Sequence, residues 1–184
     1  MLIERVPPQN IEAEQAVLGA MLIEKEAIAR VTELLKGGDF YREAHRLIFE
    51  AMLDLYNRNE AVDMITVIEL LKREDNLERV GGIAYVTSLA NSVPTAANVH
   101  YHAKIVEEKA LLRQLIQTST KIAALGYEGS EEVSQIVDQA EKMILEVSNR
   151  RIGGDFAPIK SIVLDAFGKI EQLYESRGGI TGLA

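Results

Sequence analysis

Apolar residues recur at intervals of three and four along most of the chain, the spacing that places them on one face of an α-helix. Before Pro94 the pattern is interrupted repeatedly by Gly, Pro and capping residues, so it predicts short helices. Asn10 and Asp63 are candidate N-caps for two of them, and Gly37-Gly38 would end another. The predicted helices lie at about residues 11–22, 24–35, 43–57, 64–71 and 82–92. Short helices with apolar faces predict a compact bundle.

After Pro94 the helices become longer. Thr95 or Asn98 is a candidate cap for a helix that ends near Leu125, and Ser130 is a candidate cap for a second helix that ends near Asn149. Between them lies a short turn at 126–129 that contains glycine. Two long helices joined by a short loop predict an antiparallel hairpin.

Each hairpin helix has two columns of apolar residues, one more than a two-helix hairpin needs. One column in each helix has coiled-coil spacing and predicts the seam. The predicted seams are Val133, Val137, Ala140, Ile144 and Val147 in the second helix, and Leu111, Leu115, Thr118, Ile122 and Leu125 in the first. The second columns are Ile136 and Met143, and Leu112, Ile116 and Ala123. These would pack either on the bundle or, as we favour, on another subunit or a partner protein.

Residues 151–160 contain Gly153-Gly154 and Pro158, a composition typical of a linker. Ser161 is a candidate cap for a last helix that ends near Arg177. Its apolar face consists of Ile162, Ala166, Ile170 and Leu173. The pattern therefore divides the chain into a helical bundle at 1–98, a hairpin at 99–150 and a linker with its helix at 151–184. Residues 180–184 have no feature of a natural C-terminus, so we expect a longer parent protein.

Composition favours an all-α fold and argues against several classes of function. Aromatic residues make up only 5% of the chain and Trp is absent, which favours helices over sheets. Without cysteine there is no disulfide and no thiolate-bound metal ion. The net charge of −8 disfavours a nucleic-acid-binding surface, which needs clustered positive charge. No apolar run predicts a membrane span and no signal peptide is evident, so the expected location is the cytoplasm.

No constellation of residues predicts catalysis, a cofactor or a metal ion. The Gly-Gly pairs are not followed by Gly-Lys-Ser/Thr, so they do not form a phosphate-binding loop. His100 and His102 are two positions apart on a predicted helix and point to different faces, unlike a pair of zinc ligands. His45 has no nucleophile beside it. The acidic pairs at 107–108 and 131–132 are expected on solvated helix faces.

Several segments carry information that periodicity does not. They are Pro7–Gly19 (PPQNIEAEQAVLG), Phe40–Phe49 (FYREAHRLIF), the helix start at Val62-Asp63, Gly81–Tyr85 (GGIAY) and Val93–Val99 (VPTAANV). Taken in order, they resemble the N-terminal region of the DnaB family of bacterial replicative DNA helicases. Gly179–Leu183 (GITGL) resembles the start of that family's ATPase domain. The resemblance extends over nearly the whole chain.

The resemblance implies a collar on a hexameric ring, arranged as a trimer of dimers. It implies that a DnaG-type primase docks on the collar through its C-terminal domain, and a helicase loader is a further expected partner. The linker helix would contact the neighbouring subunit's ATPase domain through Ile162, Ala166, Ile170 and Leu173. ATP, Mg and DNA would bind only to the parent's ATPase domain. This chain would therefore have no activity of its own, whereas the parent would be an ATP-dependent DNA helicase.

A surface for primase or a second subunit is expected to combine apolar anchors with a charged rim. Tyr85 is a candidate anchor because it is large and rigid with a polar tip, and Glu12 and Glu14 are candidates for the rim. The candidate interface residues are Glu12, Glu14, Tyr85, Leu112, Ile116, Ile122, Ile136 and Met143. Two alternatives remain: a free-standing helical adaptor, and a helical module that binds nucleic acid.

Overall fold

The computed structural model describes residues 6–129 and 132–152. It divides the chain into two compact units, Met1–Val147 and Ser148–Ala184, of which the second is described only at residues 148–152. All regular structure in the described residues is helical, so the predicted all-α fold is confirmed. The predicted linker helix, with Ile162, Ala166, Ile170 and Leu173, lies outside the described residues.

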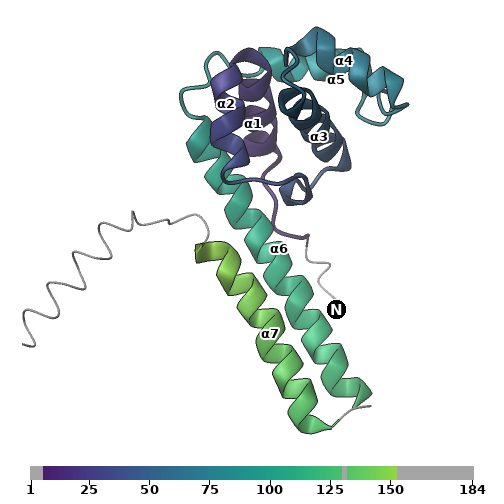
Figure 1. The fold of residues 1–184 in the computed structure, drawn as a ribbon, viewed down its shortest axis with the longest axis vertical. Coiled ribbons are helices and arrows are strands. Elements are labelled where there is room, and N and C mark those ends of the chain that lie inside the picture. Colours follow the sequence, from purple (N-terminus) through teal and green to yellow (C-terminus); the bar gives the residue numbers. More distant parts are fainter. Residues whose placement is uncertain (1–5, 130–131, 153–184) are drawn as a thin grey trace, which may run out of the picture. The chain divides into compact units, whose positions relative to one another are not determined.

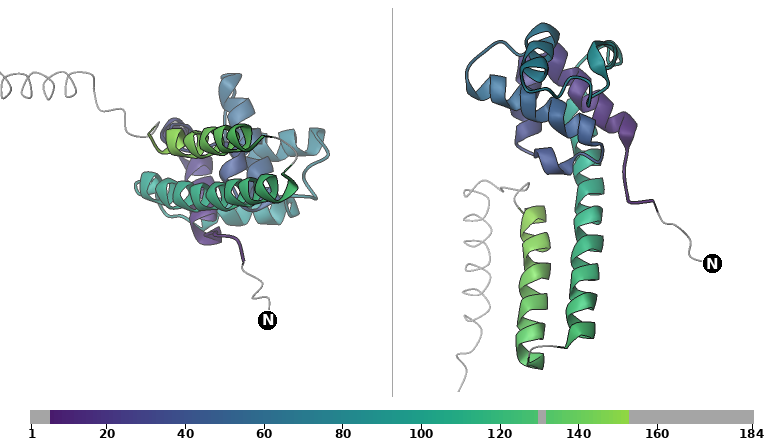
Figure 2. Two further views of the ribbon diagram at one scale, coloured as in Figure 1. Left: turned by 90° about the horizontal axis from the view of Figure 1, so that it is seen from below. Right: turned by 90° about the vertical axis from the view of Figure 1, so that its right-hand side faces the viewer.

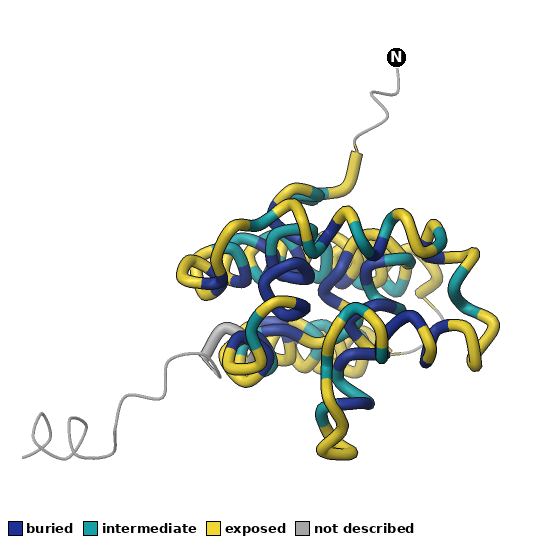
Figure 3. Tube along the Cα trace, turned by 90° about the horizontal axis from the view of Figure 1, so that it is seen from above, coloured by how far each residue is buried: buried dark blue, intermediate teal, exposed yellow. Residues whose placement is uncertain are grey.

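The first unit contains a bundle built around one central helix (Figure 1). Helix α1 packs against α2, α3, α5 and the first part of α6, while α4 packs against α3 and α5. The bundle helices are α1 (Ile11–Ile23), α2 (Lys25–Thr32), α3 (Glu43–Asn57), α4 (Met64–Arg73), α5 (Gly82–Asn91) and α6 (Val99–Glu128). Because α1 is covered on several sides, apolar residues occur nearly all around it. Helices α1 and α3 contribute the most buried residues, and the buried parts of the chain gather in the interior of the bundle (Figure 3).

Side-chain caps fix the starts of two helices where the sequence predicts them. The Asn10 side chain accepts a hydrogen bond from the Ala13 N–H at 2.9 Å and begins α1. Asp63 Oδ1 accepts from the N–H groups of Ile65 and Thr66 at 2.8 and 3.0 Å and begins α4. Both caps satisfy N–H groups that have no partner within the helix.

The connection from α2 to α3 contains a short 3-10 helix that the apolar pattern did not predict. The second predicted helix was placed at 24–35, but α2 ends at Thr32, and η1 (Gly37–Asp39) follows. The Asp39 carboxylate accepts from the Lys36 N–H at 2.8 Å and closes this turn. This local hydrogen bond offers the backbone an alternative to continuing the helix.

The glycine at position 19 allows α1 and α5 to approach closely. A Cβ atom at Gly19 would lie 2.4 Å from the carbonyl oxygen of Leu89 and 2.6 Å from Cγ2 of Val93. Only a residue without a side chain fits there, because the Leu89 oxygen belongs to the backbone and cannot rotate away.

Helix α6 belongs to both parts of the fold. Its first half packs on the bundle through Val99, Ala103, Val106 and Ala110, all buried. Its second half runs beyond the bundle and lies antiparallel to α7 (Val133–Ile152), as the views in Figures 1 and 2 agree. Gly129 ends α6 in the left-handed conformation, with φ of 54°. Among the helices of the described ranges, none combines the length and apolar content needed to cross a lipid bilayer.

Candidate partner-binding surface

The hairpin seam differs from the predicted one in α7. The residues of α7 that are buried or half-buried are Ile136, Ala140, Met143 and Val147. Val133, Val137 and Ile144, which the sequence placed in the seam, are exposed instead. In α6 the prediction was closer: Leu111, Thr118, Ile122 and Leu125 are at least half-buried, whereas Leu115 is exposed. Ile136, Met143 and Ile122, which were interface candidates, therefore contribute to the hairpin's own packing.

The remaining apolar columns form an exposed face on the hairpin. Its members are Leu112, Leu115 and Ile116 of α6 and Val133, Val137 and Ile144 of α7, whose exposed fractions run from 41% to 77%. In each helix the average direction of this column lies less than a third of a turn from that of the seam, and the rotation has the same sense in both helices. Because the two helices are antiparallel, the same rotation carries both columns to the same side. We call these six residues the hairpin face.

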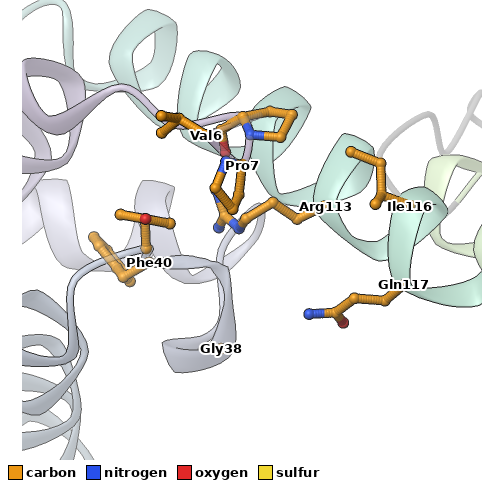
Figure 4. A pocket seen from close by; sticks show the side chains of 9 residues that line it. Val6, Pro7, Gly38, Phe40, Arg113, Ile116 and Gln117 are labelled. Atoms are coloured by element: carbon orange, nitrogen blue, oxygen red, sulfur yellow. The ribbon is translucent and has the colours of Figure 1, made fainter. Parts of the chain in front are cut away.

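A pocket of about 500 Å³ adjoins the hairpin face where α6 leaves the bundle (Figure 4). It lies between the arm before α1, the η1 turn and α6, and Ile116 belongs both to the pocket and to the hairpin face. The lining is mostly apolar, with the polar side chains of Arg113 and Gln117 on the α6 side. This size and composition are typical of a site that accepts a ligand or the side chains of a partner.

Arg113 holds the walls of this pocket together. One Nη atom donates to the carbonyl oxygen of Pro8 at 2.7 Å, and the other donates to that of Asp39. Its guanidinium also lies 5.7 Å from the centroid of the Tyr41 ring, within the range of a cation–π contact. One side chain of α6 thereby fixes the arm before α1 and the η1 turn.

A buried polar network lies behind Tyr41 and joins α1, α3 and α5. Glu14 and His45 are 1% and 0% exposed, and the Glu14 carboxylate lies 2.6 Å from His45 Nδ1. Glu14 also accepts from the Tyr41 N–H at 2.7 Å. On its other side, His45 Nε2 lies 2.7 Å from the hydroxyl of Tyr85, which Gln15 Nε2 approaches to 3.1 Å. The rings of His45 and Tyr85 are parallel, with their centroids 6.0 Å apart.

The network corrects one prediction about the interface residues. Glu14 was expected to supply rim charge at the surface, but it is buried and its carboxylate is used inside the bundle. Glu12, on the same helix, is exposed, and Tyr85 is half-buried with its hydroxyl bonded inward. The polar roles of Glu14 and His45 were missed, although each occupies a helix face that is otherwise apolar. Val17, Leu18 and Met21 follow Glu14 at helical spacing, and Ile48, Phe49 and Met52 follow His45.

Comparison with known proteins decides the family. The family described as "DnaB-like helicase N terminal domain" matches residues 6–108, which include α1 to α5 and the start of α6. The chain belongs to this family. The predicted resemblance to DnaB-type helicases is thus confirmed.

Relatives extend the similarity to nearly the whole chain. The replicative DNA helicase DnaC of Bacillus subtilis is 50% identical over 183 residues, covering 100% of this chain and 40% of that protein. The replicative DNA helicase DnaB of Geobacillus stearothermophilus is 48% identical over 180 residues, covering 98% and 40%. The chain therefore spans about 40% of the length of these curated relatives.

Solved structures share the fold. The N-terminal domain of DnaB helicase from Mycobacterium tuberculosis has a TM-score of 0.73 and 48% identity, over 77% of this chain and 99% of that chain. A DnaB-like replicative helicase, whose structure was described with its interactions with primase, has a TM-score of 0.63 over 94% of this chain and 36% of that chain. At 24% identity, the second likeness concerns the fold alone.

Within residues 6–129 and 132–152, no group of three or more metal-ligating side chains converges. The buried Glu14–His45 pair is bonded to the Tyr41 N–H on one side and to the Tyr85 hydroxyl on the other. The features that remain are the hairpin face, the pocket beside it and the surface around Tyr85.

Proposed function

We propose that this chain is the collar region of a bacterial replicative DNA helicase, which self-associates through the hairpin face and docks primase beside it. In this proposal the chain has three regions: the bundle, the hairpin and the linker segment after residue 150. In the parent hexamer, a trimer of dimers in the bacterial cytoplasm, ATP-dependent unwinding with Mg belongs to the ATPase domain. The collar itself binds proteins, including a helicase loader. The family match and the relatives named as replicative helicases support this proposal.

The observation that carries the self-association is the hairpin face. Six large apolar side chains on one side of a two-helix layer leave an apolar strip in water, and such a strip usually marks an interface. A second copy of the hairpin is a suitable occupant, because an antiparallel pair of helices packs well against an identical pair around a two-fold axis.

Replacing Val137 or Ile144 with Asp is expected to shift the protein toward smaller assemblies. An unpaired carboxylate in an apolar interface costs several kcal/mol, so dimers should dissociate at concentrations where the parent remains associated. Light scattering coupled to size-exclusion chromatography over a range of protein concentrations measures this shift for Val137→Asp and Ile144→Asp.

The matched control is Leu145→Asp. Leu145 is also an exposed apolar residue of α7, but it lies about 100° around the helix from Ile144 and so outside the hairpin face. Its assembly should equal that of the parent. A parent that is monomeric at every concentration, or a Leu145→Asp variant that dissociates as readily as the other two, would contradict the proposal.

We propose that primase docks where the bundle meets α6. Tyr41 connects its two parts, since its N–H bonds to Glu14 of the Tyr85 network while its ring lines the pocket beside Ile116. A helical partner needs an apolar anchor with polar groups at its edge. Here Ile116 and the pocket provide the apolar part, and Glu12 and Tyr85 provide the polar part.

Reversing the charge at Glu12 is expected to weaken primase binding about tenfold, because a charged pair at an interface typically contributes about 1–3 kcal/mol. Isothermal titration calorimetry with the C-terminal domain of the cognate primase compares the parent with Glu12→Lys. Glu26→Lys, at an exposed position of α2, makes the same change of charge elsewhere and should bind like the parent. If both variants bind primase equally weakly, the overall charge of the protein, and not the position of Glu12, is responsible. If the parent does not bind primase, primase is not the partner.

A further inference from the structure

The buried network has a fixed direction, which begins at Glu14. A carboxylate has no proton to give, and the Glu14 oxygens accept from the backbone N–H of Tyr41 and face that of Arg42. The same carboxylate lies 2.6 Å from His45 Nδ1, so this ring nitrogen must carry the proton that joins them. Glu14 therefore selects one tautomer of His45, as a carboxylate does for a histidine at many protein sites.

The tautomer decides what the Tyr85 hydroxyl does. In the neutral ring with its proton on Nδ1, Nε2 is an acceptor, so the Tyr85 hydroxyl at 2.7 Å donates to it. The Tyr85 oxygen in turn accepts from Gln15 Nε2 at 3.1 Å. The single proton of the hydroxyl is thus committed to the interior of the bundle, and the hydroxyl has no proton to offer to a group outside.

From this arrangement we infer that Glu14 and His45 are positioning residues that make Tyr85 a hydrogen-bond acceptor toward its partner. The partner then has to present a hydrogen-bond donor to the Tyr85 oxygen, such as a Lys, an Arg or an amide N–H. A carboxylate of the partner could not form a hydrogen bond there, because the hydroxyl proton is already donated to His45. This inference rests on the proposed docking surface around Tyr85, and it specifies the chemistry that the surface selects.

The charge beside Tyr85 agrees with a donor of positive charge. Gln15, which contacts the Tyr85 hydroxyl, is three residues after Glu12 on α1, and residues at this spacing are neighbours on a helix surface. Glu12 is exposed. A cationic side chain of the partner can therefore meet a carboxylate and the phenol oxygen together, two acceptors on one side of the bundle.

Glu14→Gln tests the direction of the network with little change in shape. The amide oxygen can still accept from the Tyr41 N–H, but the amide nitrogen donates to His45 Nδ1 and moves the ring proton to Nε2. His45 then donates to Tyr85, whose hydroxyl proton turns outward. The analogous change of a carboxylate to an amide leaves the geometry of a serine protease triad in place while imposing the wrong tautomer.

Two measurements follow from this design. Nitrogen-15 chemical shifts of the His45 imidazole at neutral pH are expected to show the Nδ1–H tautomer in the parent and the Nε2–H tautomer in Glu14→Gln. In titrations with the primase C-terminal domain, Glu14→Gln and Tyr85→Phe should each bind about tenfold more weakly than the parent. The double variant should bind no more weakly than either single one, since both remove the same hydrogen bond.

Glu26→Gln, an exposed change of the same kind, should leave both the imidazole shifts and the affinity unaltered. Nε2–H or doubly protonated His45 in the parent overturns the inference, as does a Glu14→Gln variant with the switched tautomer and undiminished affinity. If Glu14→Gln is unfolded by circular dichroism, the imidazole shifts of the parent and the affinity of Tyr85→Phe decide instead. If the parent shows the Nδ1–H tautomer but does not bind primase, the proposed docking site and the role of Tyr85 in it are both wrong. The direction of the internal network is then still confirmed.

Discussion

Replacing Glu14 with Ala is expected to destabilise the bundle by about 2–6 kcal/mol, because two buried donors lose their acceptor at about 1–3 kcal/mol each. The substitution leaves the Tyr41 N–H and the His45 ring without their acceptor inside the protein. Each unpaired buried group has lost its bond to water without a replacement. Urea unfolding followed by circular dichroism measures the free energy of unfolding.

Glu12→Ala is the matched control for this experiment. It makes the same change two residues earlier on the same helix, but at an exposed position, where the expected effect is within about 0.5 kcal/mol. If the two variants unfold at the same urea concentration, the Glu14–His45 pair contributes nothing to stability.

Gly19→Ala is expected to cost about 2–3 kcal/mol, although alanine is the better helix former by about 1 kcal/mol. The added Cβ would overlap the Leu89 carbonyl oxygen and the Val93 side chain, so α1 and α5 must move apart. The free energy of unfolding and the melting temperature should both fall.

The control here is another helical glycine. Gly126 in α6 has no atom within 4 Å of the position that a Cβ would occupy, so Gly126→Ala should gain up to about 1 kcal/mol from helix propensity. The two substitutions are thus predicted to have opposite signs. A Gly19→Ala variant as stable as the parent would mean that the helices separate at no cost.

Within the described residues, the sequence was sufficient for the α-helices and for several of their ends. The third predicted helix, 43–57, coincides with α3, and the caps at Asn10 and Asp63 lie where the pattern placed them. These features depend on neighbouring residues alone, so local chemistry determines them. The η1 turn was missed because it depends on the side chain of Asp39 closing back on Lys36, which competes with the helical pattern.

The seam of α7 could not be chosen from its sequence. Both the column with Ile136 and Met143 and the column with Val137 and Ile144 are apolar with helical spacing. Which of them faces α6 depends on the helix opposite and on the turn that joins the two. The interior network was similarly hidden, since Glu14 and His45 are 31 positions apart and meet only when α1 and α3 pack. Their positions on apolar helix faces were the one available signal.

Helix α6 connects the bundle rigidly to the hairpin, so a rotation of the bundle would move the hairpin tip. It contains no proline, and its single glycine comes near its end, so it runs unbroken from Val99 to Glu128. Arg113, close to its middle, is clamped to the arm before α1 and to the η1 turn. The 15 residues from Arg113 to Glu128 span about 22 Å at 1.5 Å per residue, so rotating the clamped part by roughly 10° would move the hairpin tip by about 4 Å. In the proposed assembly, a partner that tilts the bundle would therefore change the spacing between the hairpins of two copies without unfolding either of them.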